Sequence, residues 1–426
     1  ARLPLATKVS AHNGQVLLST GCPSLDDVLG GGLPIGSVIL IKEDRYTGYS
    51  DILLKYFLAQ GIVARHPIFL ATADENGTET FRKGLMGVSE GKGGEDDAVL
   101  TSRDGEIKNA PSLQASDGDS KLKIAWRYQG QAPPSAGTPR SPASSPSAAP
   151  QPSPSGRLPD PPYCATFDLT RKMSPQLLGD MHNQMTMLDV GLWANDDVTS
   201  KYDRLLNNIQ DLIESGGFRP TAPPPPSGIR DALRIGVHSI GSPMWGMEDC
   251  TMTSQAMFRF FHRLRGLVRF SFSTAFVTIP AHLYNDYHGV TSNPVIRRIE
   301  HMCDAVIEIE SFAGSPKTIN TAYTSDYHGF IHAIRLPRLN SLSHSTRFPE
   351  SQVRSLAFKV RRKRFLIEPF HLPPEAGDSA ERESKSKGTD LPKNQTSSVA
   401  RSVSRNIVPS TGCAAGLDMK AKQLDF

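Results

Sequence analysis

Short apolar runs recur along this chain, and most of them are followed by a segment with helical periodicity. Val38–Lys42, Ile68–Ala73, Leu233–Ile240 and Phe272–Ile279 are too short to be buried helices and are apolar along most of their length. Strands that are apolar on both faces are typical of a parallel sheet covered by helices on both sides. The alternation therefore restricts the chain to an α/β fold with a mostly parallel sheet.

Helices are predicted between these strands. The clearest is Ser200–Ser215, whose apolar residues recur at intervals of three and four and whose end is marked by a glycine. Another is predicted from Ser50, which can act as its N-cap, to a glycine stop at Gly61. Thr253–Val268 and Pro294–Met302 are predicted to be helical as well.

The last third of the chain favours strands. Three apolar runs there have no helix-forming segment between them, and the last reads as a hairpin: Ala305–Ser311, Gly329–Leu336 and Leu356–Ile367. We therefore expect antiparallel strands at one edge of the sheet, towards the C-terminus.

Two segments are predicted to be disordered. From Gly130 to Pro162, 11 residues are proline and 7 are serine, which leaves little apolar surface to offset the entropy of ordering. The end of the chain is rich in serine, lysine and glutamate. We therefore predict one domain formed by residues 14–87 and 161–374, a disordered insertion at 88–160 and a disordered tail at 375–426.

Charge and cysteine spacing argue against several classes of protein. The chain has 47 basic and 43 acidic residues, so its mildly positive charge is unlike that of a nucleic-acid coat protein. Its 5 cysteines form no CxxC pair, so neither a zinc site nor a disulfide framework is expected. No apolar run approaches the roughly 18 residues of a membrane span. We predict no metal, no cofactor and no membrane partner.

The loop after the first predicted core strand lies where nucleotide-binding α/β proteins hold phosphate. The pattern GxxxxGK[ST] provides backbone N–H groups, a lysine for the β- and γ-phosphates and a hydroxyl for Mg²⁺. Residues 43–50 read Glu-Asp-Arg-Tyr-Thr-Gly-Tyr-Ser, so Gly48 and Ser50 fit. Glu43 replaces the first glycine and Tyr49 replaces the lysine, which makes this a degenerate phosphate loop.

The charges of this loop disfavour a nucleotide. At ~5 Å and an effective dielectric constant of ~20, repulsion by one carboxylate such as that of Glu43 or Asp44 would weaken the binding of a polyphosphate by on the order of 3 kcal/mol. A later strand ends in His238 and Ser239, where an aspartate would normally help to hold Mg²⁺. We therefore predict that the chain alone is not an ATPase.

The segment before that strand resembles a known family. Residues 19–37, STGCPSLDDVLGGGLPIGS, are similar to the run that leads into the first core strand of RecA-like ATPases. Together with the degenerate loop, Ile240–Gly246 and the closing stretch Gly329–Pro373, they resemble the PAXNEB family, the fourth subunits of the Elongator complex. The resemblance covers 19–87 and 163–374.

This resemblance implies a RecA-like fold and a shared function. It implies a hetero-hexameric ring with Elongator subunits 5 and 6, which joins the catalytic subcomplex of subunits 1, 2 and 3. It also implies that the ring binds tRNA and supports modification of the wobble uridine, U34, while the chemistry lies in another subunit. ATP turnover in neighbouring subunits stays open, and we expect a cytoplasmic location, with a nuclear one left open.

Two surfaces are candidates for contact with tRNA. The loop 281–293 follows a central strand and contains His282, Tyr284, Tyr287 and His288, whose rings could stack on unpaired bases. A second candidate is a basic patch, Lys359, Arg361, Arg362, Lys363 and Arg364, which could meet phosphates. A solvated hairpin turn, a ring interface and a nuclear-targeting signal are the alternatives for this patch.

Three alternative functions remain open from the sequence. An active RecA-type ATPase would lose turnover when Ser50 is replaced by alanine. A composite site in a neighbouring subunit would need a cation from this chain, such as Arg297 or Arg298. An α/β scaffold unrelated to tRNA would show no salt-sensitive RNA binding.

Overall fold

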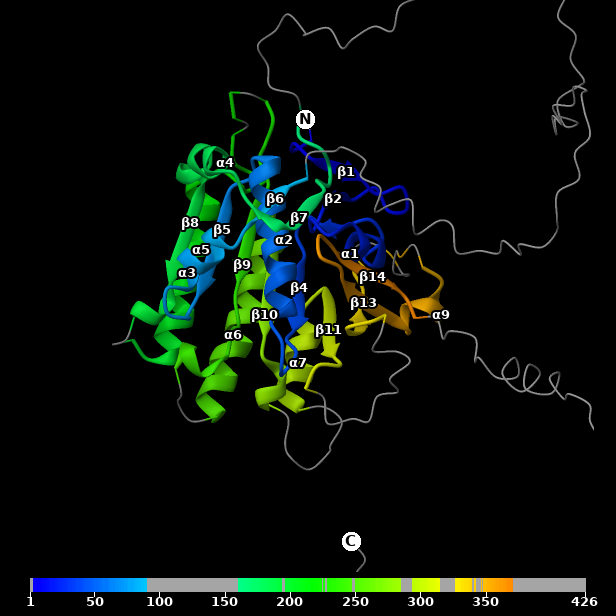
Figure 1. Cartoon of the computed structure of the whole chain (residues 1–426). Helices are drawn as coiled ribbons and strands as arrows, with labels where there is room; N and C mark the ends of the chain where they lie inside the picture. Colours follow the sequence, from blue (N-terminus) through cyan, green and yellow to red (C-terminus); the bar gives the residue numbers. More distant parts are fainter. Residues whose placement is uncertain are drawn as a thin grey trace, which may run out of the picture. The chain divides into compact units, whose positions relative to one another are not determined.

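A computed structural model describes residues 3–89, 160–193, 196–223, 225–226, 228–246, 250–284, 293–314, 326–338, 341, 346 and 348–370. These residues form one sheet of nine strands with helices on both sides, together with a three-stranded and a two-stranded sheet (Figure 1). Among them, no helix is long and apolar enough to cross a membrane. The predicted insertion and tail lie largely outside the described residues.

The described residues contain α-helices, 3₁₀ helices and strands. The α-helices are α1 (Pro23–Val28), α2 (Tyr49–Ala64), α3 (Gly77–Lys83), α4 (Pro175–Asp180), α5 (Val198–Ser215), α6 (Cys250–Arg269), α7 (Pro294–Met302) and α9 (Glu350–Val353). The 3₁₀ helices are η1 (His182–Gln184), η2 (Val190–Leu192), η3 (Pro243–Trp245) and η4 (Ala281–Tyr284). The strands are β1 (Thr7–Val9), β2 (Val16–Leu18), β3 (Leu33–Pro34), β4 (Val38–Lys42), β5 (Ile68–Thr72), β6 (Met86–Val88), β7 (Phe167–Lys172), β8 (Met185–Asp189), β9 (Leu233–Val237), β10 (Ser273–Ile279), β11 (Ala305–Ser311), β12 (Gly329–Arg335), β13 (Leu356–Val360) and β14 (Phe365–Pro369).

The large sheet is parallel at its centre and antiparallel at one end. Its order is β14-β13-β12-β11-β4-β10-β9-β5-β8. The strands from β11 to β8 pair in parallel, whereas β11, β12, β13 and β14 pair antiparallel. This confirms the predicted α/β class and its antiparallel C-terminal strands. It also brings the loops after β4, β5, β9, β10 and β11 to one edge of the sheet.

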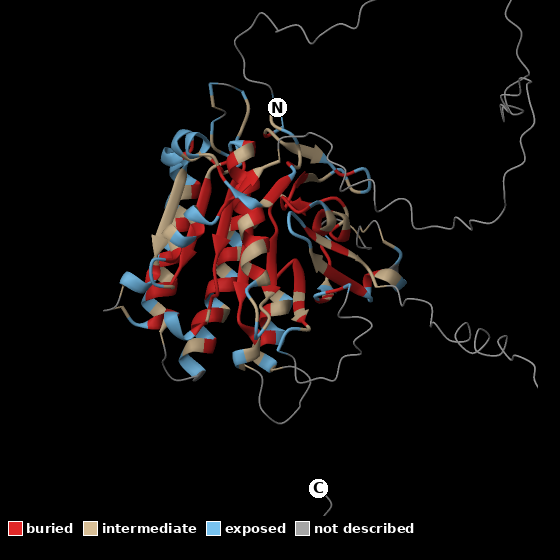
Figure 2. Cartoon of the chain, in the orientation of Figure 1, coloured by how far each residue is buried: buried red, intermediate tan, exposed pale blue. Residues whose placement is uncertain are grey.

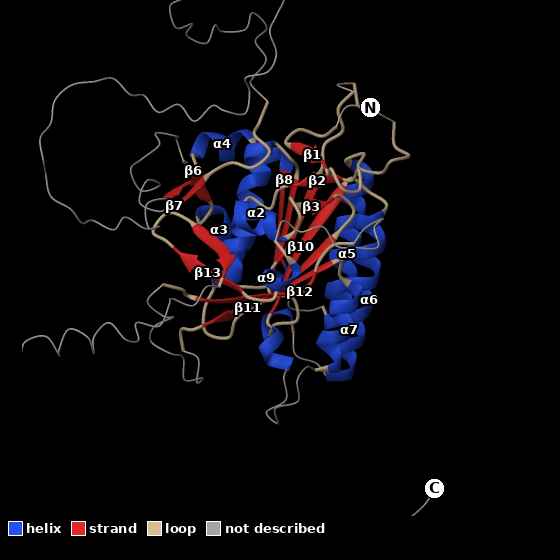
Figure 3. Cartoon of the chain, turned by 90° about the vertical axis from the view of Figure 1, so that its right-hand side faces the viewer, coloured by secondary structure: helices blue, strands red, loops and turns tan. Residues whose placement is uncertain are grey.

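Two apolar cores lie on opposite faces of this sheet. Figure 3 shows α5, α6 and α7 on one side, and α2, α3, β6 and β7 on the other. The first core is built around Phe260 and Phe261 of α6, and the second around Phe57 of α2. Figure 2 shows that buried residues fill the central strands and the inner sides of these helices.

Helix α5 forms as the sequence predicts. Its apolar stripe is buried against α6, and the Asp197 carboxylate caps it by accepting a hydrogen bond of 2.9 Å from the Ser200 amide. The edge strand β8 and the pair β6–β7 were not predicted. All five residues of β8 are half-buried, which gives that strand no strong apolar signal.

The prediction for α2 was wrong at both ends. Gly48 is the N-cap, and Ser50 lies buried inside the first turn rather than capping it. The helix also passes Gly61 and ends at Ala64, where Arg65 adopts a left-handed φ of 58°. A Cβ at Gly61 would lie 2.8 Å from Cδ of the buried Arg234, so this glycine permits close packing instead of ending the helix.

Candidate functional site at the carboxyl edge of the sheet

The segment that leads into β4 is held by a buried carboxylate. Asp26 accepts hydrogen bonds of 2.5 Å from Ser19 Oγ and 2.7 Å from both the amide and the hydroxyl of Thr20. Burial raises the pKa of Asp26 to about 6, although these hydrogen bonds oppose the shift. At Gly32, with a φ of +138°, a Cβ would lie 2.5 Å from the Leu18 carbonyl oxygen, so the tight return requires glycine.

Glu43, which replaces the first glycine of the phosphate pattern, is tied to the neighbouring strand ends. Its carboxylate accepts hydrogen bonds from Thr278 Oγ1 at 2.6 Å and from Ser239 Oγ at 3.2 Å. Burial raises the pKa of Glu43 above its ordinary value. Ser239 itself adopts a φ of 48°, a strained conformation for serine at the end of β9.

Asp44 and Lys42 are also satisfied within the chain. Asp44 accepts hydrogen bonds from Thr47 Oγ1 at 2.7 Å and from the Ser311 amide at 3.2 Å, so the loop folds around its carboxylate. Lys42 Nζ lies 2.9 Å from Glu308 and 3.1 Å from Glu300. Partial burial opposes the charged form, but these two carboxylates outweigh it and raise the pKa of Lys42. Lys42, which directly precedes the loop, is thus held on the side of β4 that faces away from α2.

Tyr49 occupies the position of the phosphate-binding lysine and points elsewhere. Its ring lies against Phe358 of β13 at a centroid distance of 4.9 Å, and Phe365 and His328 are each 6.4 Å away. The side chain therefore belongs to an aromatic cluster with the antiparallel strands. Ser50 is 2% exposed, and its hydroxyl lies 3.4 Å from Asp51 Oδ1.

His238 stands at the end of β9, where a metal-binding aspartate was sought. Its Nε2 lies 3.0 Å from Asp51 Oδ1, and its Nδ1 lies 3.3 Å from Asp74 Oδ2 and 3.2 Å from Thr72 Oγ1. Burial alone would lower its pKa, but the hydrogen bond that it donates to Asp51 and the charges of Asp51, Asp74 and Glu43 raise it. The His238 side chain therefore fills the position in sequence where an Mg²⁺-binding aspartate was sought. Asp51, in the first turn of α2, was missed by the sequence analysis, although an acid there is a normal partner of the helix dipole.

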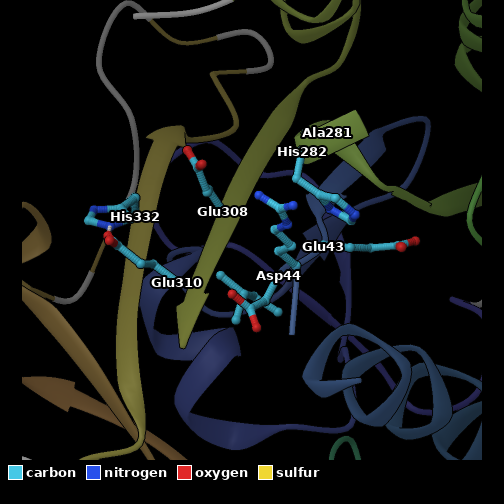
Figure 4. Close-up of a pocket in the computed structure, with 9 residues that line it drawn as sticks. Glu43, Asp44, Ala281, His282, Glu308, Glu310 and His332 are labelled. Carbon is cyan, nitrogen blue, oxygen red and sulfur yellow. Dashed lines mark hydrogen bonds and ion pairs between the residues drawn. The ribbon is translucent and has the colours of Figure 1, made fainter. Parts of the chain in front are cut away.

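Two cavities open at this edge, and both are rich in acids. One, of about 390 Å³, is lined by Glu43, Asp44, Arg45, Ala281, His282, Glu308, Ile309, Glu310 and His332. Figure 4 shows Glu308 and the Glu310–His332 pair on one side of it, and Glu43 and His282 on the other. The second, of about 170 Å³, lies beside His238 and is lined by three further carboxylates, those of Asp51, Asp74 and Glu75.

The electrostatics of the edge disfavour a polyphosphate. Glu43, Glu308 and Glu310 are each paired with a hydroxyl, a lysine or a histidine of the chain itself. Asp51, which is paired with His238, lies at the N-terminus of α2, where an anion would otherwise bind. Arg45 lies beside Tyr46 instead, with its guanidinium 5.5 Å from the ring centroid. Within the described ranges, no group of three or more His, Cys, Asp or Glu residues is arranged to hold a metal ion.

The structure describes two of the four residues of the predicted tRNA-facing loop. Tyr284 donates a hydrogen bond of 2.6 Å from its hydroxyl to the Gly241 carbonyl, so its ring is held on the domain. His282 lines the larger cavity, and burial lowers its pKa. Tyr287 and His288 lie outside the described residues.

The predicted basic patch is divided as well. The Lys359 ammonium forms an ion pair with Glu368 and lies 4.7 Å from the centroid of the Tyr327 ring, with 15% of its side chain exposed. The other four cations, Arg361–Arg364, form the exposed turn between β13 and β14. Lys359 lies within β13 and is paired across the hairpin with Glu368 of β14, whereas the other four follow the strand.

The fold and the site together define a class of protein. It is an α/β protein with a strand–loop–helix unit of the kind that binds phosphate in other proteins, and the acidic side chains of this loop and of the first helical turn are bonded within the chain. The chain belongs to the PAXNEB family, whose model, PAXNEB protein, matches residues 1–402. It is 37% identical to Elongator complex protein 4 of Danio rerio, over 89% of this chain and 87% of that protein. It is 35% identical to proteins of the same name in Xenopus laevis and Homo sapiens, over 89% of this chain and 85% and 82% of theirs.

Proposed function

We propose that this chain is a non-catalytic subunit of the Elongator complex. It forms a hetero-hexameric ring with subunits 5 and 6, and the ring joins the catalytic subcomplex of subunits 1, 2 and 3. In that assembly it takes part in binding tRNA and supports modification of the wobble uridine, U34. It acts in the cytoplasm, and a nuclear pool is compatible with the same role.

One observation carries the proposal. The curated relatives named Elongator complex protein 4 match this chain over most of their length, so the likeness covers the whole domain and not one motif. The loop geometry supports the non-catalytic role, because Tyr49 packs on Phe358 and His238 is held between Asp51 and Asp74. A nucleotide would have to displace several of these contacts.

Assembly is tested by native mass spectrometry of the tagged chain, purified at its natural expression level. The expected result is a mass that fits a six-membered ring containing two further RecA-like proteins. A monomer or a ring of this chain alone would contradict the proposal.

Catalysis is tested separately on the purified chain. We expect no binding of a fluorescent ATP analogue with Mg²⁺ and no turnover, both for the natural chain and for Ser50→Ala. Turnover that disappears in Ser50→Ala would support an active ATPase. Turnover that appears only in the ring and disappears in Arg297→Ala/Arg298→Ala would instead support a composite site.

A further inference from the structure

Six cations gather where strand β7 meets the turn between β13 and β14. They are Arg171, Lys172, Arg361, Arg362, Lys363 and Arg364, all of them exposed. We propose that this surface, the β7–turn face, binds the phosphate backbone of RNA. The proposal rests on the tRNA-binding role proposed above and gives it a surface distinct from the loops at the carboxyl edge. Figure 3 shows β7 on the same side of the sheet as α2.

A backbone hydrogen bond joins the two segments, which are far apart in sequence. The Leu169 amide donates to the Lys363 carbonyl at 2.9 Å. Leu169 is available because the pairing of β6 with β7 passes from Asp168 directly to Lys172, which leaves a bulge between them. A bulge redirects the side chains of the strand that carries it, and here that strand carries Arg171.

The turn itself is firmly held. Arg361 and Arg364 exchange backbone hydrogen bonds of 2.9 and 3.2 Å. At its base, the Phe365 ring stacks on Phe358 at 5.1 Å, and the Phe365 amide donates to the Tyr56 hydroxyl at 3.2 Å. Because the backbone of the turn is already ordered, the protein loses less conformational entropy when a ligand binds these cations.

The fold does not require cations at this turn. Tight hairpins favour Gly, Asn or Asp at the tip, and this one has Arg362 and Lys363. None of the residues 361–364 has a positive φ. Adjacent like charges repel one another, so Arg361 and Arg362 oppose the formation of the turn slightly and are better explained by a ligand.

The carboxylate among these cations is turned inward. The Asp168 side chain is 9% exposed and accepts hydrogen bonds of 2.9 and 2.6 Å from the Thr170 amide and hydroxyl. These two bonds lower the pKa of Asp168, as do the charges of Lys363 and Arg171. Asp168 is thus influenced by cations from both segments. Its Oδ2 lies 3.9 Å from Arg171 Nε, and the Arg171 side chain is 60% exposed.

The composition of the face favours RNA over a protein partner. The large hydrophobic side chains that the described part of the chain exposes lie outside β7 and outside the turn. Stable protein interfaces have an apolar centre, whereas nucleic-acid interfaces are polar and strongly positive. Arginine, which supplies four of the six cations, binds phosphate through two parallel N–H groups.

The test compares two variants with equal charge changes in the assembled complex. The test variant is Arg171→Gln/Lys172→Gln/Arg361→Gln/Arg362→Gln. The matched control, with its arginines on α5, on α6 and just after α5, is Arg204→Gln/Arg219→Gln/Arg259→Gln/Arg263→Gln. Binding of an unmodified tRNA transcript is measured at salt concentrations from about 50 to about 200 mM, a range in which counterion release changes the affinity strongly.

The test variant should bind tRNA at least ~10-fold more weakly at the lowest salt, and its salt slope should fall by about 3, since each lost phosphate contact removes about 0.7–0.9. The control should change binding less than about twofold. Thermal melting of both variants checks that they remain folded.

The outcomes separate the two proposals. Undiminished tRNA binding by the test variant would overturn the β7–turn face, as would equal losses in both variants. Normal tRNA binding with a lost ring would overturn it too, because the face would then be a protein interface. A natural chain that fails to assemble but binds tRNA through this face would sink the ring proposal alone. A natural complex that binds no tRNA would contradict both.

Discussion

The carboxyl edge of the sheet and the β7–turn face are opposite solutions to the same chemical problem. The edge has the strand–loop–helix arrangement that holds phosphate in many α/β proteins, but Glu43, Asp44 and Asp51 occupy it. The face is assembled from a bulged strand and a hairpin turn and carries a dense group of cations. The difference teaches that the topology of a site and the charge of its ligand are independent.

The two regions also differ in how their charges are satisfied. At the edge, six carboxylates already have a hydrogen-bond or ion-pair partner within the chain: Glu43, Asp44, Asp51, Asp74, Glu308 and Glu310. On the face, the Arg171 side chain is mostly exposed and Asp168 is bonded to Thr170. Exposed cations such as Arg171, Arg361 and Arg362 are the ones that a ligand can reach.

The largest predicted effect removes the residue that connects the two regions. Phe365 is 2% exposed, stacks on Phe358 beneath the turn and lies in the same cluster as Tyr49. Phe365→Ala should lower the free energy of unfolding by about 3–5 kcal/mol, through lost burial and a cavity. Urea denaturation measures this. Ile334→Ala, at a side chain 45% exposed, is the control and should change stability by less than about 1 kcal/mol; equal effects would contradict the packing described.

A second prediction tries to restore the lysine of the phosphate pattern. Tyr49→Lys should lower the free energy of unfolding by about 2 kcal/mol, because the aromatic contacts with Phe358 are lost. It should not create ATP binding, since Glu43 and Asp44 remain. Titration with a fluorescent ATP analogue checks this, with Tyr49→Phe as the control that keeps the ring. Micromolar binding by Tyr49→Lys would mean that the single lysine, and not the acidic loop, decides the ligand.

Much of the edge could be predicted from the sequence because it depends on local order. The apolar run Val38–Lys42, the loop after it and the later strand ending at His238 fix where the loops meet in a parallel sheet. The replaced glycine and lysine are visible as letters. What Tyr49 does instead was not visible, because its partner Phe358 lies about three hundred residues away and is reached only through the antiparallel strands.

The β7–turn face could be predicted only in part. The run Arg361–Arg364 stands out in the sequence, but Lys359 was grouped with it because its ion pair with Glu368 across the hairpin is not visible in the sequence. Arg171 and Lys172 could not be joined to it, since the contact between Leu169 and Lys363 depends on a bulge that has no sequence signature. The assumed cap at Ser50 failed for a similar reason, because tertiary packing buries that residue.

A third prediction concerns the pH dependence that His238 gives to the edge. A folded-state pKa raised above the ordinary 6.5 means that the stabilisation is fully present below pH 6.5 and is lost as pH rises through the folded pKa. His238→Gln should therefore lower the free energy of unfolding by about 1 kcal/mol at pH 6 and by less at alkaline pH. Urea denaturation across this range measures the difference. A constant difference at every pH would show that the imidazolium is not the stabilising form.

The groups around His238 determine what remains in the variant. The imidazole of His238 faces Asp51 on α2, Asp74 after β5 and Glu43 in the loop. The adjoining cavity is also lined by Lys55 and Glu75. Burial raises the pKa of Glu43, so its ionisation also lowers stability as pH rises. His238→Gln should therefore flatten the pH profile without removing its slope, and Glu43→Gln should reduce what is left.

The smallest predicted effect sharpens the comparison most. Arg361→Gln/Arg362→Gln should leave the free energy of unfolding within about 0.5 kcal/mol of the natural value, or slightly above it, because repulsion at the turn is relieved. Arg259→Gln/Arg263→Gln is the matched control: both guanidinium groups contact Asp203, at 2.8 and 3.0 Å, and losing these exposed pairs should cost up to about 1 kcal/mol. Urea denaturation of the two variants side by side gives the comparison. If the turn variant lost more stability than the control, its cations would be stabilising the fold as the edge carboxylates do, and the argument that they serve a ligand would fail.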